Sequence, residues 1–250
     1  MKSSRNILNE ASQTASKQFA EQNTTVWIDP FVNAPFQYKE AFLSLRTNIS
    51  FLSATNDVKK IIITSSIPGE GKTSIAVNLS LALSNAGNTV LLVDTDLRKP
   101  MVHKLLNITN GTRFGLTNIL RDKDCVTERC IRPRIDRKGL SVIPCGIIPP
   151  NPTELLGSAR LGAIFETLSN VYNYIIFDTP PVSVVTDAAV LSRYADGIMF
   201  VVRQKKTTFE QARQAKRNLD AVNANILGVV MNDFNYKHID KSDSYYHNYY

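Results

Sequence analysis

The chain has 250 residues, 43% hydrophobic and 20% charged, a composition typical of a globular protein with one sizeable core. It has no apolar run of about 18 residues and no signal-peptide pattern, so we expect a cytoplasmic protein that reaches the membrane only through a partner. Cys125, Cys130 and Cys145 lack CxxC spacing and the three histidines are scattered, which argues against a disulfide framework and a zinc site. The net charge of +7 comes without a basic stripe of interleaved aromatic residues, so we expect a solvated surface and no nucleic-acid partner.

The first 35 residues are rich in Ser, Asn, Gln and Thr, and their apolar residues are sparse and aperiodic, which predicts a mobile N-terminal arm. From residue 38 to 52 apolar residues recur at helical spacing and predict a helix. A β-branched strand at 60–64 follows, and then a glycine-bearing segment with the sequence SSIPGEGKTS at 65–74. A helical pattern continues from there to about residue 83.

The segment SSIPGEGKTS lies between a strand and a helix, as a phosphate-binding loop does. The usual pattern is G-x-x-x-x-G-K-[ST], and Ser66 takes the place of the first glycine. Lys72 can reach the β- and γ-phosphates, and the Thr73 hydroxyl can ligate Mg²⁺. A glycine-rich turn that only happens to contain a lysine is the alternative. We expect nucleotide contacts from the whole loop: Pro68, Gly69, Glu70, Gly71, Lys72, Thr73 and Ser74.

Further apolar strands are expected at 89–93, 140–144, 174–177, 197–202 and 226–231, with helices at 116–120, 161–171, 187–194 and 208–221. Near-continuous apolar strands that alternate with helices predict an α/β fold with a mostly parallel central sheet and helices on both faces, of the P-loop NTPase kind. We assign this domain to residues 36–234.

Two apolar strands end in aspartates, in VLLVDTDLRKP and in YIIFDTPP. Ligands of parallel sheets bind beyond the carboxyl ends of the strands, so Asp94, Asp96 and Asp178 should converge on the loop. Asp94 and Asp178 are candidate magnesium ligands with Thr73, while Asp96 could be base, metal ligand or both. Helix capping is the alternative role for strand-end aspartates.

Three further polar residues have two possible roles each. Arg98 and Lys99 are candidate phosphate or subunit contacts, or else solvated surface side chains. Asn232, after the last strand, is placed to hydrogen-bond an adenine edge, although asparagine is also common in such turns for backbone reasons.

Residues 235–250 contain five tyrosines among Asp, Ser, Asn, His and Lys, with Ile239 as the one aliphatic residue. Such a segment cannot form a core, so we expect a flexible tail. The tyrosines are Tyr236, Tyr245, Tyr246, Tyr249 and Tyr250.

The strings SSIPGEGKTS, LLVDTDLRKP, GIIPPNPTELLGS and YIIFDTPP, with the terminal tyrosine cluster, resemble the bacterial tyrosine kinases (BY-kinases). The resemblance is to the cytosolic kinases encoded beside capsule or exopolysaccharide genes in Gram-positive bacteria. It implies autophosphorylation of the tail tyrosines with ATP and Mg²⁺, and control of polysaccharide synthesis and export. By position, the resemblance makes Lys72, Asp94, Asp96 and Asp178 the catalytic residues, with Lys72 and Thr73 as the phosphate and Mg²⁺ residues.

The resemblance also implies partners. These are a transmembrane activator of the polysaccharide chain-length type, a cognate tyrosine phosphatase and further copies of the chain in a ring. Family members form the ring through an E-x-x-R-x-x-R helix motif. Here EAFLSLR supplies Glu40 and Arg46, but Leu43 replaces the first arginine, which bears on the strength or size of the ring.

Two alternatives share the same loop and carboxylates. One is a nucleotide-switched assembly ATPase of the partition or division-site type, and the other is a nucleotide-binding scaffold of a polysaccharide export complex. The related ATPases have a signature lysine at the second loop position, where this chain has Ile67, and they lack a tyrosine-dense tail. Both differences favour the kinase.

Overall fold

Seven strands form one sheet in the computed structural model, which describes residues 34–108, 111, 113–133 and 139–234. The strand order is β3-β4-β2-β5-β1-β6-β7, and all neighbours are parallel except β3 with β4. The predicted mostly parallel sheet is thus confirmed, whereas residues 1–33 of the predicted arm and the tail at 235–250 lie outside the described ranges. The strands are β1 Lys60–Ser65, β2 Val90–Asp94, β3 Arg132–Pro133, β4 Leu140–Ile143, β5 Tyr174–Asp178, β6 Gly197–Arg203 and β7 Ile226–Asn232.

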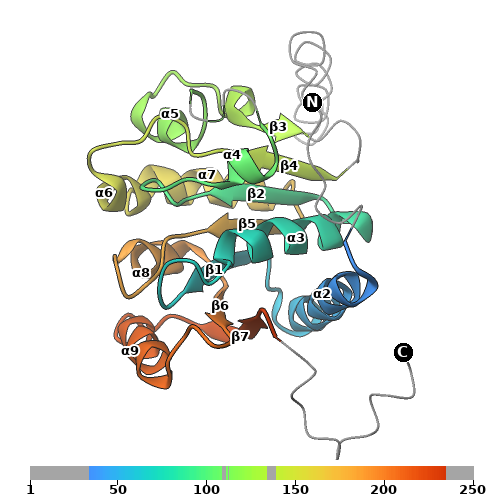
Figure 1. Ribbon diagram of the computed structural model, residues 1–250. Helices are drawn as coiled ribbons and strands as arrows, with labels where there is room; N and C mark the ends of the chain where they lie inside the picture. The colour runs from blue at the N-terminus through green and yellow to red at the C-terminus, as the bar shows by residue number, and fades with distance from the viewer. Residues whose placement is uncertain (1–33, 109–110, 112, 134–138, 235–250) are drawn as a thin grey trace, which may run out of the picture.

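Helices cover both faces of this sheet, as predicted (Figure 1). One face is covered by α2 (Phe36–Asn56), α3 (Lys72–Asn85) and α4 (Val102–Leu105). The other face is covered by α5 (Leu116–Arg121), α6 (Pro152–Leu156), α7 (Ala159–Ser169), α8 (Asp187–Leu191) and α9 (Phe209–Asp220).

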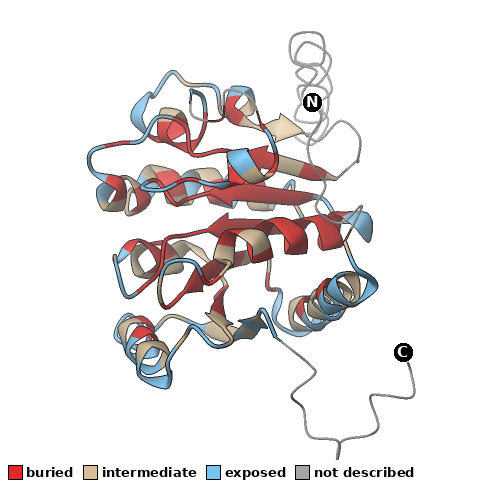
Figure 2. Cartoon of the chain, viewed as in Figure 1, coloured by how far each residue is buried: buried red, intermediate tan, exposed pale blue. Residues whose placement is uncertain are grey.

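The central strands are buried on both faces, which explains their unbroken apolar sequences (Figure 2). Successive side chains of a strand point to opposite faces, so Ile61 and Ile63 join one core cluster while Ile62 joins the other. Phe177 of β5 meets Phe165 of α7 edge to face, with ring centroids 4.7 Å apart. The two layers of helices are therefore joined through one buried sheet.

The structure differs from the predicted elements mainly where the elements are short. Helix α4 and the two-residue strand β3 were not predicted, because so few residues show no periodicity. The helix expected at 187–194 divides into α8 and a 3₁₀ turn at Ser192–Tyr194. Helix α2 extends beyond its predicted ends in both directions. In the described part of the chain, no helix is both long and apolar enough to span a bilayer.

Candidate functional site

The loop between β1 and α3 depends on two glycines in the left-handed backbone region. Gly69 has a φ of 79° and Gly71, the N-cap of α3, a φ of 91°, conformations that other residues rarely adopt. A Cβ atom at Gly71 would also lie 2.1 Å from the Asn232 side-chain nitrogen. The backbone conformation therefore favours glycine at Gly71, and a Cβ atom there would displace the Asn232 side chain at the end of β7.

The buried side chain of Glu70 holds the loop from inside. Its Oε2 accepts a hydrogen bond from the Ile67 amide at 2.8 Å, and its Oε1 accepts one from the Thr207 hydroxyl. Asn232 donates to the Glu70 carbonyl at 2.8 Å. The end of β7 and the β6–α9 connection therefore both brace the phosphate loop. Asn232 does lie at the expected loop, whereas its predicted contact with adenine stays a prediction.

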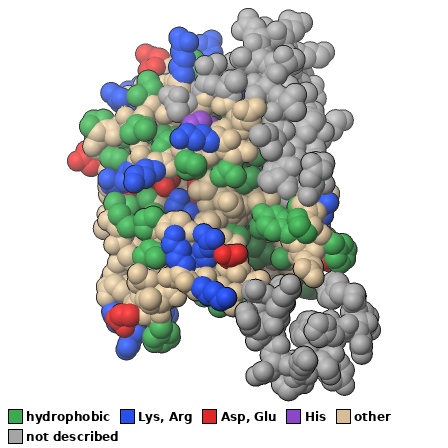
Figure 3. Space-filling model, in the orientation of Figure 1, with side chains coloured by type: hydrophobic (Ala, Val, Ile, Leu, Met, Phe, Trp, Pro, Cys, Tyr) green, Lys and Arg blue, Asp and Glu red, His purple; other side chains and the backbone are tan. Residues whose placement is uncertain are grey.

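Two further cations approach the tip of the loop, and sequence reasoning missed both. Arg203 and Lys206 donate to the Gly69 carbonyl at 3.1 and 3.2 Å. They lie more than 130 residues away along the chain, so no local pattern connects them, or Thr207, with the loop. Basic side chains outnumber acidic ones on the face visible in Figure 3, in keeping with the net charge of +7.

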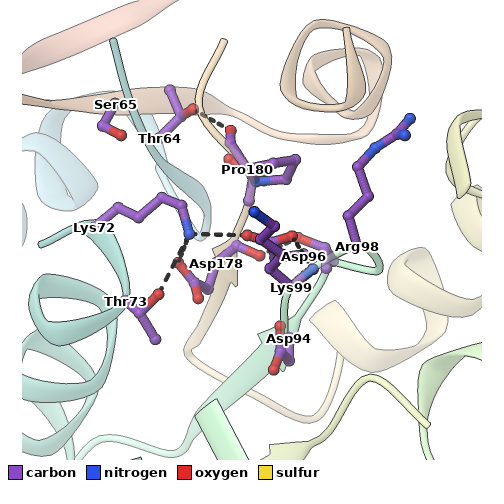
Figure 4. Close-up of polar contacts among 12 residues, drawn as sticks. Thr64, Ser65, Lys72, Thr73, Asp94, Asp96, Arg98, Lys99, Asp178 and Pro180 are labelled. Atoms are coloured by element: carbon purple, nitrogen blue, oxygen red, sulfur yellow. Dashed lines mark hydrogen bonds and ion pairs between the residues drawn. The ribbon is translucent and has the colours of Figure 1, made fainter. Parts of the chain in front are cut away.

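Lys72 lies between two of the predicted carboxylates (Figure 4). Its ammonium donates to Asp96 Oδ2 at 3.0 Å and lies 3.8 Å from Asp178 Oδ1. It also contacts the Thr73 hydroxyl at 3.4 Å. Burial alone lowers the pKa of Lys72, but the charges of Asp178, Asp96 and Asp94 outweigh burial, and the net shift is upward. The lysine therefore stays protonated, as phosphate binding requires.

Asp94 and Asp178 are paired in the register of neighbouring strands, and both are fully buried. Burial raises the pKa of Asp178 to about 6, with the Lys72 charge and the nearby Thr73 hydroxyl opposing the shift. Burial and the Asp178 charge raise the pKa of Asp94 well above its ordinary value, although its Oδ2 accepts a hydrogen bond from the Val102 amide at 3.1 Å. These carboxylates therefore retain protons more readily than exposed ones do.

The donor set fits a magnesium ion that phosphate and water help to coordinate. Three buried oxygens, Asp94 Oδ1 and both oxygens of Asp178, have no hydrogen-bond partner among the described residues. The described ranges contain no group of three or more His, Cys, Asp or Glu side chains that would hold a metal alone. Mg²⁺ commonly takes one or two carboxylates and completes its shell with substrate phosphates and water. Thr73, Asp94 and Asp178 are consistent with that pattern.

The remaining predicted residues are distributed as follows. The Arg98 guanidinium pairs with the buried carboxylate of Asp187 at 2.8 Å, so this partly exposed side chain is anchored by an ion pair and is not a free surface cation. Lys99 is exposed, and its backbone amide donates to Asp96 Oδ1 at 2.9 Å. Glu40 and Arg46 lie half-buried on α2. The five tail tyrosines lie outside the described residues.

A glycine loop between a parallel strand and a helix, with its lysine paired to carboxylates at the same sheet edge, defines a nucleotide-binding protein of the P-loop NTPase class. In agreement, a ParA family model, described as NUBPL iron-transfer P-loop NTPase, matches residues 57–248. The MinC:MinD cell division complex of Aquifex aeolicus is 21% identical, with a TM-score of 0.60 over 72% of this chain and 70% of that one. At that identity the likeness shows the fold alone.

More similar proteins narrow the class to one family. Tyrosine-protein kinase YwqD of Bacillus subtilis (strain 168) is 40% identical over 77% of this chain and 80% of its own length. Putative tyrosine-protein kinase CapB of Staphylococcus aureus is 34% identical over 84% of this chain and 89% of its own. The crystal structure of the chimerical protein CapA2B2 superposes with a TM-score of 0.73 at 33% identity, over 88% of this chain and 97% of that one. The chain belongs to the bacterial tyrosine-protein kinase family, as its motifs predicted.

Proposed function

We propose that this chain transfers the γ-phosphate of ATP to tyrosines of its own C-terminal tail and thereby regulates capsular or exopolysaccharide synthesis and export. The observation that supports this most is the position of Lys72 between Asp96 and Asp178 at the end of a phosphate-binding loop. The chain also places five tyrosines after its last strand, where a flexible tail could present them.

ATP binding is assigned to the loop 68–74, and Asn232 is assigned to the adenine base. Backbone amides around Gly69 and Gly71 would bind the phosphates, and the Lys72 ammonium would neutralise charge on the β- and γ-phosphates. Thr73, Asp94 and Asp178 would hold Mg²⁺, which supplies charge neutralisation across the phosphates when bound.

Asp96 is assigned as the acceptor of the tyrosine proton. The tyrosine oxygen forms a bond to the γ-phosphorus while the bond from that phosphorus to the β–γ bridging oxygen breaks, and ADP leaves. The hydroxyl proton passes to an Asp96 carboxylate oxygen, and the adjacent Lys72 ammonium, 3.0 Å away, stabilises that carboxylate before transfer. The chain's own contribution is therefore positioning and charge stabilisation.

The tail is long enough to serve as substrate. A flexible linker of about 12 residues has an r.m.s. span of roughly 20 Å and a contour length of about 40 Å. It can therefore present a tyrosine to its own or a neighbouring subunit's site at an effective concentration on the order of millimolar. A weak site for free tyrosine is then sufficient.

The organisation proposed around this domain is a mobile arm at 1–35, the kinase domain at 36–234 and a tyrosine-rich tail at 235–250. A transmembrane activator of the same polysaccharide locus recruits the chain to the inner face of the membrane. A cognate tyrosine phosphatase reverses the modification. Copies of the chain assemble into a ring through Glu40 and Arg46 of α2.

A nucleotide-switched assembly ATPase is the second candidate, because MinD structures share the fold. Incubation with radiolabelled ATP, Mg²⁺ and a peptide from the cytoplasmic end of the activator separates the two functions. We expect label on the wild type and none on Lys72→Met or on a chain truncated at Asn235. Phosphate release without protein label would support the ATPase. If neither labelled protein nor free phosphate forms, the remaining function is a nucleotide-binding scaffold.

Lys216→Met provides the matched control for Lys72→Met. Lys216 is an exposed lysine of α9 that pairs with Asp220 four residues on. Its loss should leave labelling unchanged. Equal loss of label in both lysine variants would contradict the role assigned to Lys72.

A further inference from the structure

Asp187, the first residue of α8, is a fully buried carboxylate beyond the reach of Lys72, and both of its oxygens are engaged. Arg98 binds it through two nitrogens, with Nε 2.8 Å from Oδ2 and Nη2 3.2 Å from Oδ1. The Thr153 hydroxyl donates to Oδ1 at 2.6 Å and accepts from Arg98 Nη2 at 3.0 Å. The three side chains therefore form a closed network in which each one contacts the other two.

This network joins three segments that are distant in sequence. Arg98 lies in the loop after β2, two residues beyond Asp96, and Asp187 lies in the segment that leaves β5 after Asp178. Thr153 lies in the first turn of α6, within the proline-rich string GIIPPNPTELLGS, for which the proposed chemistry gives no other role. The network thus connects the segments that follow β2 and β5, the two strands that end in Asp94 and Asp178.

Charge and geometry make this contact specific. A buried carboxylate is strongly unfavourable without a hydrogen-bonded partner, and a planar guanidinium supplies two parallel donors that lysine cannot match. The Arg98 side chain is 39% exposed, yet in Figure 4 it points away from Lys72. The hydrogen bond with Asp187 is the largest cause of the raised pKa of Arg98, and the negative charges of Asp187 and Asp96 raise it further. Arg98 therefore acts as an anchor of its loop.

The anchor is linked to the reacting groups by one short stretch of backbone. The amide of Lys99, the residue next to Arg98, donates to Asp96 Oδ1 at 2.9 Å, while Asp96 Oδ2 accepts from Lys72 at 3.0 Å. A shift of Arg98 therefore moves the amide that orients the Asp96 carboxylate. We propose that Asp187, with Thr153, is a positioning residue that acts through Arg98 to aim Asp96 at Lys72 and at the acceptor hydroxyl. This role rests on the proposed kinase function.

Four variants of the full-length chain test the proposal in the presence of the activator peptide. Asp187→Asn weakens the ion pair with Arg98, and Thr153→Val removes the bridging hydroxyl. Arg98→Lys keeps the positive charge but loses the two parallel hydrogen-bond donors of the guanidinium. Asp220→Asn is the matched control, because it breaks the exposed Lys216–Asp220 pair. We expect kcat for autophosphorylation to fall about 100-fold in Asp187→Asn and less in the other two network variants, because misplacement of about 1 Å has such an effect. The KM for ATP should stay within about twofold, since the phosphate loop itself is intact.

A double variant separates positioning from simple stability. Arg98→Met with Asp187→Leu leaves no unpaired buried charge, so its Tm should return toward the wild-type value. Its kcat should stay low, because nothing anchors the loop. Recovery of kcat together with Tm would overturn the proposal, as would a kcat loss in Asp187→Asn no larger than in Asp220→Asn.

Hydrogen exchange makes the result independent of the kinase assignment. Amides at residues 95–101 should exchange faster in Asp187→Asn than in the wild type or in Asp220→Asn, whatever reaction the site performs. Absence of tyrosine label on the wild type would refute the proposed function alone. Unchanged exchange at 95–101 would refute the positioning role alone.

Discussion

At the scale of single residues, burial controls the protonation of Asp94 and Asp178. Asp178 is fully buried and its pKa is about 6, against an ordinary value of 3.8. Between these two values the folded protein binds more protons than the unfolded chain does, so the free energy of unfolding falls as pH rises through this window. Asp94 is shifted in the same direction. Burial thus favours the protonated form of both carboxyl groups, and a bound cation would instead stabilise their ionised form.

We therefore predict that Asp178→Asn flattens the pH dependence of stability between 3.8 and about 6. Urea unfolding with chelator and without nucleotide, at several pH values across this window, measures the effect. The wild type should lose stability as pH rises, and the variant should lose less. Parallel curves for the two proteins would contradict the raised pKa of Asp178.

Gly71 and Gly87 allow a matched test of the phosphate loop. Both are left-handed, at 91° and 90°, but a Cβ atom at Gly87 would meet nothing within 4 Å. Gly87→Ala should therefore reduce stability by about 1 to 2 kcal/mol through backbone strain and leave nucleotide affinity unchanged. Gly71→Ala should in addition displace Asn232 and weaken ATP binding at least about tenfold. Equal ATP affinities by calorimetry would show that the close approach of Asn232 is unimportant.

At the scale of elements, stability is concentrated in the central strands. Phe177 of β5 is fully buried between β1 and β2 and packs on Phe165 of α7. We expect Phe177→Ala to lower the free energy of unfolding by about 3 to 5 kcal/mol, because it leaves a cavity under the sheet. Phe209→Ala, at an 83% exposed position of α9, should change it by less than about 0.5 kcal/mol. Chemical denaturation of both variants measures this contrast, and similar values would contradict a core centred on β5.

At the scale of the whole molecule, we expect α2 to determine how copies of the chain meet in the proposed ring. Glu40, Leu43 and Arg46 are spaced three residues apart on this helix, so they share one face. Leu43→Arg should restore the family motif. It should lower the protein concentration needed for assembly by roughly fivefold or more, because each new contact between copies contributes about 1 kcal/mol. Ser44→Arg, at an exposed neighbouring position, should not. Light scattering over a dilution series measures both, and equal masses for the two variants would exclude a role for residue 43.

Phosphorylation should act on the same assembly through charge. Five phosphotyrosines add about −8 to −10 charges, enough to reverse the sign of a chain with a net charge of +7. We expect fully phosphorylated protein to form smaller assemblies than dephosphorylated protein at about 0.1 M salt, with the difference shrinking at higher ionic strength. An identical mass in solution for both forms would contradict this expectation.

The sequence by itself determined the class of fold, the phosphate loop and the family. Apolar runs, glycine spacing and strand-end aspartates are local patterns, and the rules of parallel sheets turn them into one edge where Lys72, Asp96 and Asp178 meet. The short elements α4 and β3 escaped prediction because too few residues form them to show a period.

Only the tertiary structure decided which groups at that edge are paired. Thr207 and Asn232 brace Glu70 across 137 and 162 residues of sequence, and Arg98 meets Asp187 across 89. The packing of helices on the sheet creates such contacts, and no spacing along the chain encodes them. Asp94, Asp178 and Asp187 are all fully buried, but within the described residues both oxygens of Asp187 accept hydrogen bonds, whereas Asp94 Oδ1 and both oxygens of Asp178 accept none. Desolvation of a carboxyl group depends on all the atoms packed around it, so its effect on the pKa can be assessed only from the folded structure.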